Sequence, residues 1–124
     1  MRVLVCGGRD YNDGAKVKKT LDDFCDMRGL VDDEYNMPLG VTVIHGGATG
    51  ADRWADEWAV TNWLPIKEYK ADWKAHGKAA GPIRNQQMLD DGKPDVVIAF
   101  SGGKGTADMI SRAEKAGLPI IRIL

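Results

Sequence analysis

The chain has 124 residues, of which 44% are hydrophobic, and it carries a formal net charge of -1 at pH 7. This length suits one globular domain with a buried core, so we predict a single domain over residues 1–124. The near-neutral charge argues against a large nucleic-acid surface, which requires clustered lysines and arginines. The chain enters a strand-like segment directly and has no long apolar run, which predicts a cytoplasmic protein without a membrane span.

The two cysteines predict neither a disulfide nor a metal site. Cys6 lies in an apolar run and Cys25 in a helical pattern, where buried free thiols are usual. They share no metal-ligand spacing. We therefore expect no metal and no cofactor.

The first half of the chain contains the pattern of two strand–helix units. The expected elements are a strand over 2–6, a helix over 13–28, an acidic surface loop over 30–40, a strand over 41–44 and a helix from Ala51. In the second helix the spacing predicts that Trp54 and Trp58 pack inward.

The second half continues the alternation. The expected elements are an edge strand over 65–69, a short helix over 83–89, a strand over 95–100, a helix after Thr106 and a strand over 118–123. The apolar run over 95–100 is typical of a strand inside a parallel sheet. Strands alternating with helices predict an α/β fold, a single Rossmann-like doubly wound domain with a parallel sheet of about five strands.

Glycine pairs follow three of the predicted strands. These pairs are Gly7-Gly8, Gly46-Gly47 and Gly102-Gly103. The carboxyl ends of parallel strands meet at one edge, where ligands bind. Glycine permits close backbone approach, and the amides that begin the next helix attract an anion, so we predict phosphate binding. No loop has the GxGxxG or Walker A spacing, which argues against an ATPase.

Several side chains near these glycines allow two interpretations, one as ligand contacts and one as structural residues. Arg9 and Arg84 could contact phosphate, or could form surface ion pairs with Asp10, Asp90 or Asp91. Lys104 could contact phosphate or remain solvated. His45 could donate to a ligand or be satisfied by a backbone carbonyl. Tyr11 and Trp73 could stack on a base or cover the core.

Thr49 and Asp52 have the spacing of a capping box at the start of the second helix. In this interpretation Thr49 is the N-cap and Asp52 reaches back to its amide. A carboxylate repels phosphate. If Asp52 contacts a ligand, we therefore expect it to bind a ribose hydroxyl.

Four segments together resemble the YspA branch of the SLOG superfamily. They are GGRDY at 7–11, HGGATGAD at 45–52, AGPIRN at 80–85 and FSGGKGT at 100–106. The resemblance covers nearly the whole chain and implies a Rossmann-like fold. Relatives include LOG phosphoribohydrolases, which release a base from a nucleoside monophosphate, and a DNA-processing protein that holds single-stranded DNA. Many others are inferred sensors of nucleotide-derived signals.

The third loop resembles the LOG pattern PGGxGTxxE with two departures. Ser101 replaces the proline, and Met109 stands at the position of the glutamate. The resemblance associates that glutamate with cleavage of the glycosidic bond, which a methionine cannot assist. Asp108 would take the same position only if the helix rotated by about 100°. Whether the chain is an enzyme is therefore left open.

We expect a binding module for a phosphate-bearing nucleotide or a nucleotide-derived ligand, such as an ADP-ribose-like or NAD-derived molecule. The alternatives are an N-glycosidase or phosphoribohydrolase using Asp52 or Asp108, and a protein that binds single-stranded DNA. A homodimer is compatible with the sequence. The predicted ligand-binding residues are Gly7, Gly8, Arg9, His45, Gly46, Gly47, Thr49, Gly50, Asp52, Arg84, Asn85, Gly102, Gly103, Lys104, Gly105 and Thr106.

Overall fold

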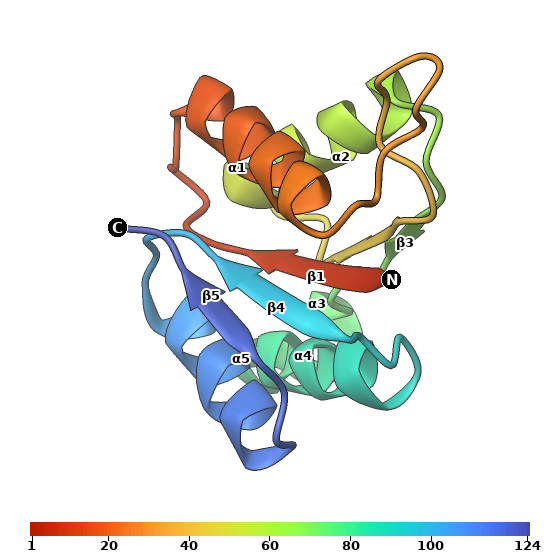
Figure 1. The fold of residues 1–124 in the computed structure, drawn as a ribbon. Helices are drawn as coiled ribbons and strands as arrows, with labels where there is room; N and C mark the ends of the chain where they lie inside the picture. Colours follow the sequence, from red (N-terminus) through yellow and green to blue (C-terminus); the bar gives the residue numbers. More distant parts are fainter.

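A computed structural model describes all residues 1–124 and contains one parallel sheet between two layers of helices (Figure 1). The strands are β1 (Arg2–Cys6), β2 (Thr42–His45), β3 (Ile66–Glu68), β4 (Val96–Ala99) and β5 (Ile120–Arg122). The helices are α1 (Gly14–Met27), α2 (Ala51–Thr61), α3 (Trp73–His76), α4 (Ala80–Asp90) and α5 (Lys104–Lys115), with a 3-10 turn, η1 (Gly77–Ala79), before α4.

The strand order is β3-β2-β1-β4-β5, and every neighbouring pair is parallel. Val3 at the centre pairs with Val43 of β2 and Val96 of β4. Helices α1 and α2 cover one face of the sheet, and α4 and α5 cover the other (Figure 1). The predicted α/β doubly wound fold with five parallel strands is therefore confirmed. Strands β2 and β3 are added on one side of β1, and β4 and β5 on the other. The change of side falls between β1 and β4, which is where such folds bind ligands.

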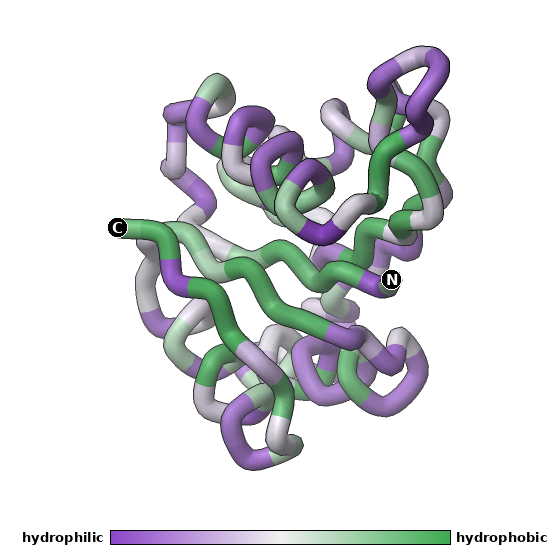
Figure 2. Tube along the Cα trace, viewed as in Figure 1, coloured by the Kyte–Doolittle hydropathy of each residue, from purple (hydrophilic) through white to green (hydrophobic).

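The central strands are buried on both faces, and their side chains supply two separate cores. Val3 and Val5 pack with α1 and α2, whereas Leu4 and Cys6 pack with α4 and α5. Figure 2 shows these strands as hydrophobic segments between helices that carry hydrophilic residues. This two-sided burial explains why strands of the sheet read as continuous apolar runs in the sequence.

The first two helices pack together through an aromatic contact. Trp58 is buried, as predicted, and its indole nitrogen donates to Asp22 at 2.9 Å. Trp54 is only partly buried. Its ring covers Gly14, where an added Cβ would lie 2.6 Å from ring carbons, so only glycine fits there. The indole nitrogen of Trp54 donates to the main-chain oxygen of Tyr11 at 3.3 Å.

The predicted helix boundaries require correction at two places. Helix α5 begins at Lys104 rather than after Thr106, and α4 begins at Ala80 rather than at Ile83. Pro82 lies in the first turn of α4, where a missing N–H removes no helical hydrogen bond. The sequence interpretation also missed α3, whose four residues are too few to show periodicity.

None of the helices has both the length and the apolar composition needed to span a bilayer. Both cysteines are free and buried.

Candidate functional site

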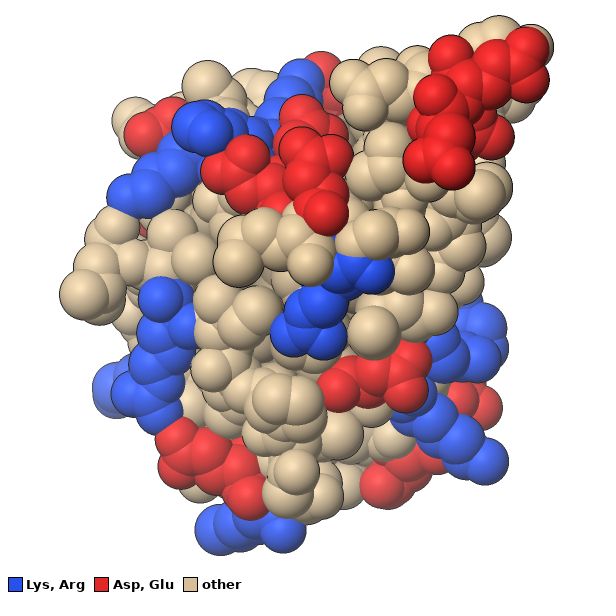
Figure 3. All heavy atoms as spheres, in the orientation of Figure 1, with Lys and Arg blue, Asp and Glu red and all other residues tan.

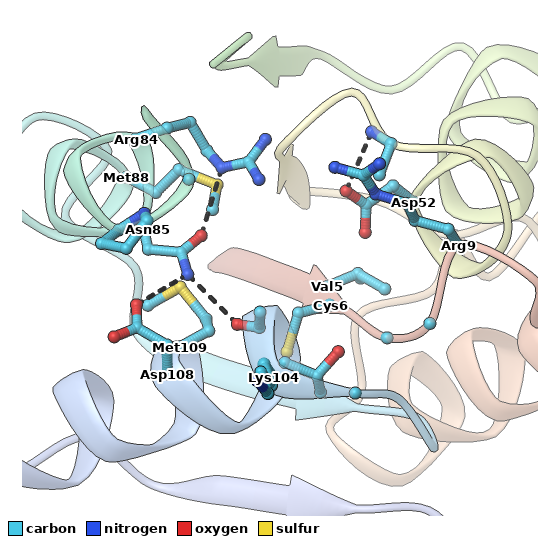
Figure 4. A pocket seen from close by; sticks show the side chains of 18 of the residues that line it. Val5, Cys6, Arg9, Asp52, Arg84, Asn85, Met88, Lys104, Asp108 and Met109 are labelled. Atoms are coloured by element: carbon cyan, nitrogen blue, oxygen red, sulfur yellow. Dashed lines mark hydrogen bonds between the residues drawn. The ribbon is translucent and has the colours of Figure 1, made fainter. Parts of the chain in front are cut away.

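A cleft of about 890 Å³ opens at the carboxyl edge of the sheet (Figure 4). Val5 and Cys6 of β1 lie at its floor, Arg84 and Asn85 of α4 on one side, and Asp52 and Arg9 on the opposite side. The predicted ligand-binding residues that line this cleft are Gly7, Gly8, Arg9, Asp52, Arg84, Asn85, Gly103, Lys104, Gly105 and Thr106. The structure thus brings together residues from three glycine-rich loops.

The remaining predicted residues lie beside this cleft. Gly46, Gly47 and Thr49 line a neighbouring cavity of about 340 Å³. His45 faces a further hollow of about 370 Å³ beside Asp56 of α2. Gly50 and Gly102 line none of these three spaces. The predicted set therefore divides between the cleft, its surroundings and the contacts between loops.

The loops around the cleft floor pack closely against one another. The Gly8 amide donates to the carbonyl oxygen of Ser101 at 2.9 Å. A Cβ added at Gly50 would lie 2.1 Å from the Gly8 oxygen, and one at Gly102 would lie 2.1 Å from Oγ1 of Thr106. These two glycines are required by close packing between loops, independently of any ligand.

Three other glycines have no such internal requirement. A Cβ added at Gly103 or Gly105 would meet nothing within 4 Å, and one at Gly81 would make only an ordinary contact at 3.5 Å. None of the three has a positive φ. All three line the same cleft. They keep open a space that the protein itself does not fill.

The predicted capping box is wrong. The N-cap of α2 is Gly50, with a φ of +78°, and it makes no side-chain capping bond. Thr49 instead donates from Oγ1 to the main-chain oxygen of Arg9 at 2.8 Å. Asp52 accepts from the amides of Gly46 and Ala48 at 3.1 and 3.3 Å. The left-handed residue at position 50 turns the preceding loop over Asp52, so the nearest amides belong to that loop.

Asp52 is a buried carboxylate with one free oxygen at the cleft. Both amides bind Oδ2, and Oδ1 accepts no hydrogen bond from the protein. Burial raises the pKa of Asp52, although His45, the two amides and Arg84 act in the opposite direction. Because this carboxylate already accepts from the amides of Gly46 and Ala48, those two amides are not available to a phosphate.

His45 is committed to contacts within the protein. Its Nδ1 accepts from the Gly47 amide at 2.9 Å, so Nε2 carries the proton and donates to Oδ2 of Asp56 at 2.7 Å. His45 is 1% exposed and does not line the cleft. Its partners are an amide and a carboxylate rather than the backbone carbonyl considered above.

Arg84 and Asn85 begin a network that crosses from α4 to α5. Arg84 donates from Nη1 to the main-chain oxygens of Gly46 and Tyr69, and from Nε to Oδ1 of Asn85 at 3.2 Å. Asn85 donates from Nδ2 to the Gly105 oxygen at 3.2 Å. The surface ion pairs considered for Arg9 and Arg84 do not form. Burial lowers the pKa of Arg84, Asp52 raises it, and nearby Arg9 lowers it further.

Asp108 lines the cleft next to Met109, which holds the position of the LOG glutamate. It accepts from Nδ2 of Asn85 at 2.9 Å and from Nε of Arg112 at 2.8 Å. Partial burial acts to raise the pKa of Asp108, but these two hydrogen bonds outweigh it and the pKa is lowered. Met109 is 1% exposed and belongs to the core beneath α5, as its apolar character predicts.

The N-terminus of α5 is the part of the cleft best suited to an anion. Its N-cap is Gly103, with no side-chain capping bond and no acidic residue in the first turn. Lys104 lies in that turn, is exposed and forms no ion pair. Amides that begin a helix carry positive partial charge and bind phosphate. Helix α2 differs, because its first turn contains the carboxylate of Asp52.

The two candidate stacking residues have different environments. Tyr11 packs on Phe100 with a centroid distance of 5.3 Å and covers the core. Trp73 is 50% exposed and lines the cleft, with the Arg9 guanidinium 5.5 Å from its ring centroid. Cys6 also lines the cleft, but burial raises the pKa of its thiol to about 12, with Asp52 adding to the shift, so it is a neutral wall residue.

Sequence reasoning missed the contribution of the segment between β3 and α4. Lys78 lines the cleft, and Lys70 lines the neighbouring cavity. The available signal was Asp72, whose side chain accepts from the Ala75 amide at 3.1 Å and caps α3. An N-cap there predicts a short helix that carries Trp73 to the cleft. The structure has no group of three or more His, Cys, Asp or Glu that could hold a metal ion.

A parallel five-stranded sheet with a glycine-lined cleft at its switch point defines a Rossmann-like α/β protein. The model of the YspA, cpYpsA-related SLOG family matches residues 1–76, and the chain belongs to this family, as the resemblance predicted. Gene 61 protein of Mycobacterium phage D29 is 39% identical over 130 residues, which cover 97% of this chain and 94% of that protein. The X-ray structure of TM1055, a structural genomics target, has a similar fold. Its TM-score is 0.63 at 18% identity, covering 97% of this chain and 72% of that one.

Proposed function

We propose that this protein binds a phosphate-bearing nucleotide or nucleotide-derived ligand, such as an ADP-ribose-like or NAD-derived molecule, and acts as a sensor or binding module. The observation that carries the proposal is that three glycines line the cleft although the protein does not require glycine there. A side chain at Gly103 or Gly105 would meet no atom of the protein, and one at Gly81 would make only an ordinary contact. The cleft volume of about 890 Å³ is within the range of small-molecule sites. Membership of a SLOG family also supports a nucleotide-related ligand.

The chemistry of the cleft suggests how such a ligand is oriented. A phosphate binds the free amides at the start of α5, beside the ammonium group of Lys104. The unpartnered Oδ1 of Asp52 accepts a hydrogen bond from a ribose hydroxyl. A carboxylate at that point repels a phosphate, so the two ends of the ligand are distinguished by charge.

Hydrolysis of the ligand is not part of the proposal. Asp108 accepts hydrogen bonds from Asn85 and Arg112, and its pKa is lowered. It is therefore ionised near neutral pH and has no proton to donate to a leaving group. Asp52 accepts two amide hydrogen bonds. Met109 fills the core position at which the LOG resemblance requires a glutamate.

Binding of single-stranded DNA is also less well supported. The face seen in Figure 3 has acidic and basic side chains beside one another, and its densest acidic group projects from the loop between α1 and β2. That face offers no continuous basic surface. With a net charge of -1, the chain lacks the excess of cations on which backbone binding depends.

A thermal-shift titration tests the proposed function. At least one of the compounds AMP, ADP-ribose and NAD is expected to raise the Tm at millimolar concentration, because a ligand that binds only the folded state stabilises it. Lys104→Glu is expected to abolish that shift without unfolding the protein, since Lys104 is exposed. Lys93 lies in the α4–β4 connection and lines neither the cleft nor the neighbouring cavity. Lys93→Glu makes the same change of charge there and is the control variant, expected to retain the shift. The absence of a shift with all three compounds would contradict the proposal.

A further inference from the structure

The neighbouring cavity of about 340 Å³ adjoins the main cleft and shares four residues with it: Arg9, Ala48, Trp73 and Arg84. Arg9 lies over Trp73, and this pair stands between the two spaces. Lys70 and the glycine loop over 46–49 complete the neighbouring cavity. A ligand in the cleft can therefore extend past Arg9 and Trp73 into a second, smaller space.

The second cavity has an excess of positive charge. Its lining contains Arg9, Lys70 and Arg84 and no carboxylate. The Arg9 guanidinium forms no ion pair or hydrogen bond with the protein, and Lys70 approaches Glu68 only at 3.8 Å while remaining 78% exposed. Arg84 uses Nε and Nη1 within the protein and leaves Nη2 free. The closeness of Arg9 is one of the causes that lower the pKa of Arg84. An anion between the two guanidinium groups removes that repulsion.

The polar groups around this cavity favour an anion over a neutral sugar. Sugar hydroxyls need acceptors, but the Gly46 oxygen already accepts from Arg84, and the Arg9 oxygen accepts from Thr49. Apart from the Thr49 hydroxyl and the Trp73 indole, the polar side chains that line this cavity are the cations Arg9, Lys70 and Arg84. Guanidinium groups bind phosphate through paired charge-assisted hydrogen bonds.

We propose that the cavity formed by Arg9, Lys70 and Arg84 is a second anion subsite, and that the ligand is a nucleotide with a second phosphate remote from the first. This inference rests on the proposed function, because it assigns the first phosphate to the start of α5. The nucleoside then lies between the two phosphates, with its ribose near Asp52.

Calorimetric titration of AMP, ADP and adenosine 3′,5′-bisphosphate tests the second subsite. ADP has two adjacent phosphates and serves as the control for charge. The bisphosphate is expected to bind the wild-type protein about tenfold more tightly than AMP. Lys70→Glu and Ala71→Glu each place a carboxylate at the second cavity only, so both are expected to remove this gain and leave the affinity for AMP unchanged. Lys93→Glu is expected to retain the gain.

The outcomes separate this inference from the proposed function. AMP binding with no gain for the bisphosphate, or a gain that survives both cavity variants, would overturn the second subsite and leave the proposed function intact. An affinity for ADP equal to that for the bisphosphate would overturn the requirement for a remote phosphate. If none of the three compounds binds, the proposed function fails and the second subsite fails with it.

Discussion

Asn85 donates from its side-chain nitrogen to the main-chain oxygen of Gly105 at 3.2 Å, so a buried residue of α4 holds the first turn of α5 at the cleft. The same nitrogen binds Asp108, and its side-chain oxygen accepts from Arg84. The side-chain amide of Asn85 thus fixes the position of Arg84 relative to the first turn of α5, which is proposed to bind phosphate.

Replacing Asn85 with Ala is expected to lower the free energy of unfolding by about 2 kcal/mol, because partly buried groups on three residues lose their partner. Urea denaturation measures this change. Gln87 is exposed on the same helix, and Gln87→Ala is the matched control, expected within about 0.5 kcal/mol of the wild type. Equal stabilities for the two variants would show that the network does not hold the helices together.

Asp52→Asn is expected to change how stability depends on pH. The folded state raises the pKa of Asp52, so the charged carboxylate costs folding free energy above its ordinary pKa of 3.8. This cost is absent at lower pH and develops as the pH rises from 3.8 through the raised folded value. Relative to Asp52→Asn, which stays neutral, the wild type therefore loses stability over that window. Parallel urea titrations from pH 3 to pH 7 test it, and a constant difference would contradict burial of the charge.

Gly105→Ala separates stability from ligand binding. An added methyl group meets nothing in the protein, and Ala favours a helix over Gly by up to about 1 kcal/mol, so the Tm is expected to stay equal or rise. Because Gly105 lines the cleft, the added methyl group is expected to weaken nucleotide affinity about tenfold. Gly117→Ala should do the reverse, losing about 1 kcal/mol at its φ of +76° without affecting binding. Unchanged affinity in Gly105→Ala would remove the main support for the cleft.

Base release from AMP is expected to be no faster with the wild-type protein than in buffer. Met109→Glu would restore the carboxylate of the LOG pattern, but at a position that is 1% exposed, so we expect a cost of several kcal/mol. Chromatography of the products and melting curves are measured together for the wild type, Met109→Glu and Asp108→Ala. Turnover by the wild type that disappears in a folded Asp108→Ala would establish Asp108 as a catalytic acid.

Single-stranded DNA is expected to bind weakly, with an affinity that falls steeply as salt increases, because the protein has no excess of cations. Fluorescence anisotropy with a short labelled oligonucleotide measures this affinity at low and physiological salt. Tight binding at physiological salt would favour the DNA-binding alternative over a small-molecule ligand.

Much of the fold was predictable because the burial of this sheet is simple. The apolar run that forms β4 is buried on both faces, and such runs are typical of inner parallel strands. The boundaries near glycine and proline were less predictable. Gly105 lies inside α5 and Pro82 inside α4, since the first turn of a helix tolerates both residues better than its interior does.

The candidate site was predictable where it is made of strand ends and harder to predict where side chains make their own connections. The common edge of the glycine loops follows from parallel topology. The partners of Asp52 do not, because spacing alone suggested a bond to Thr49, whereas the turn at Gly50 directs the carboxylate to the preceding loop. Lys70 and Lys78 reach their positions through a segment with no periodic pattern.

The closely packed floor of the cleft limits which parts of it can diversify. The Gly8 amide binds the Ser101 carbonyl, and Gly50 and Gly102 leave no room for a side chain. Substitution at these positions therefore disrupts the fold before it alters ligand selectivity. Trp73, Lys78 and Lys104 stand around that floor on surfaces that accept other residues. A new ligand preference could therefore evolve by exchanging these rim side chains over a floor whose donors and acceptors stay the same.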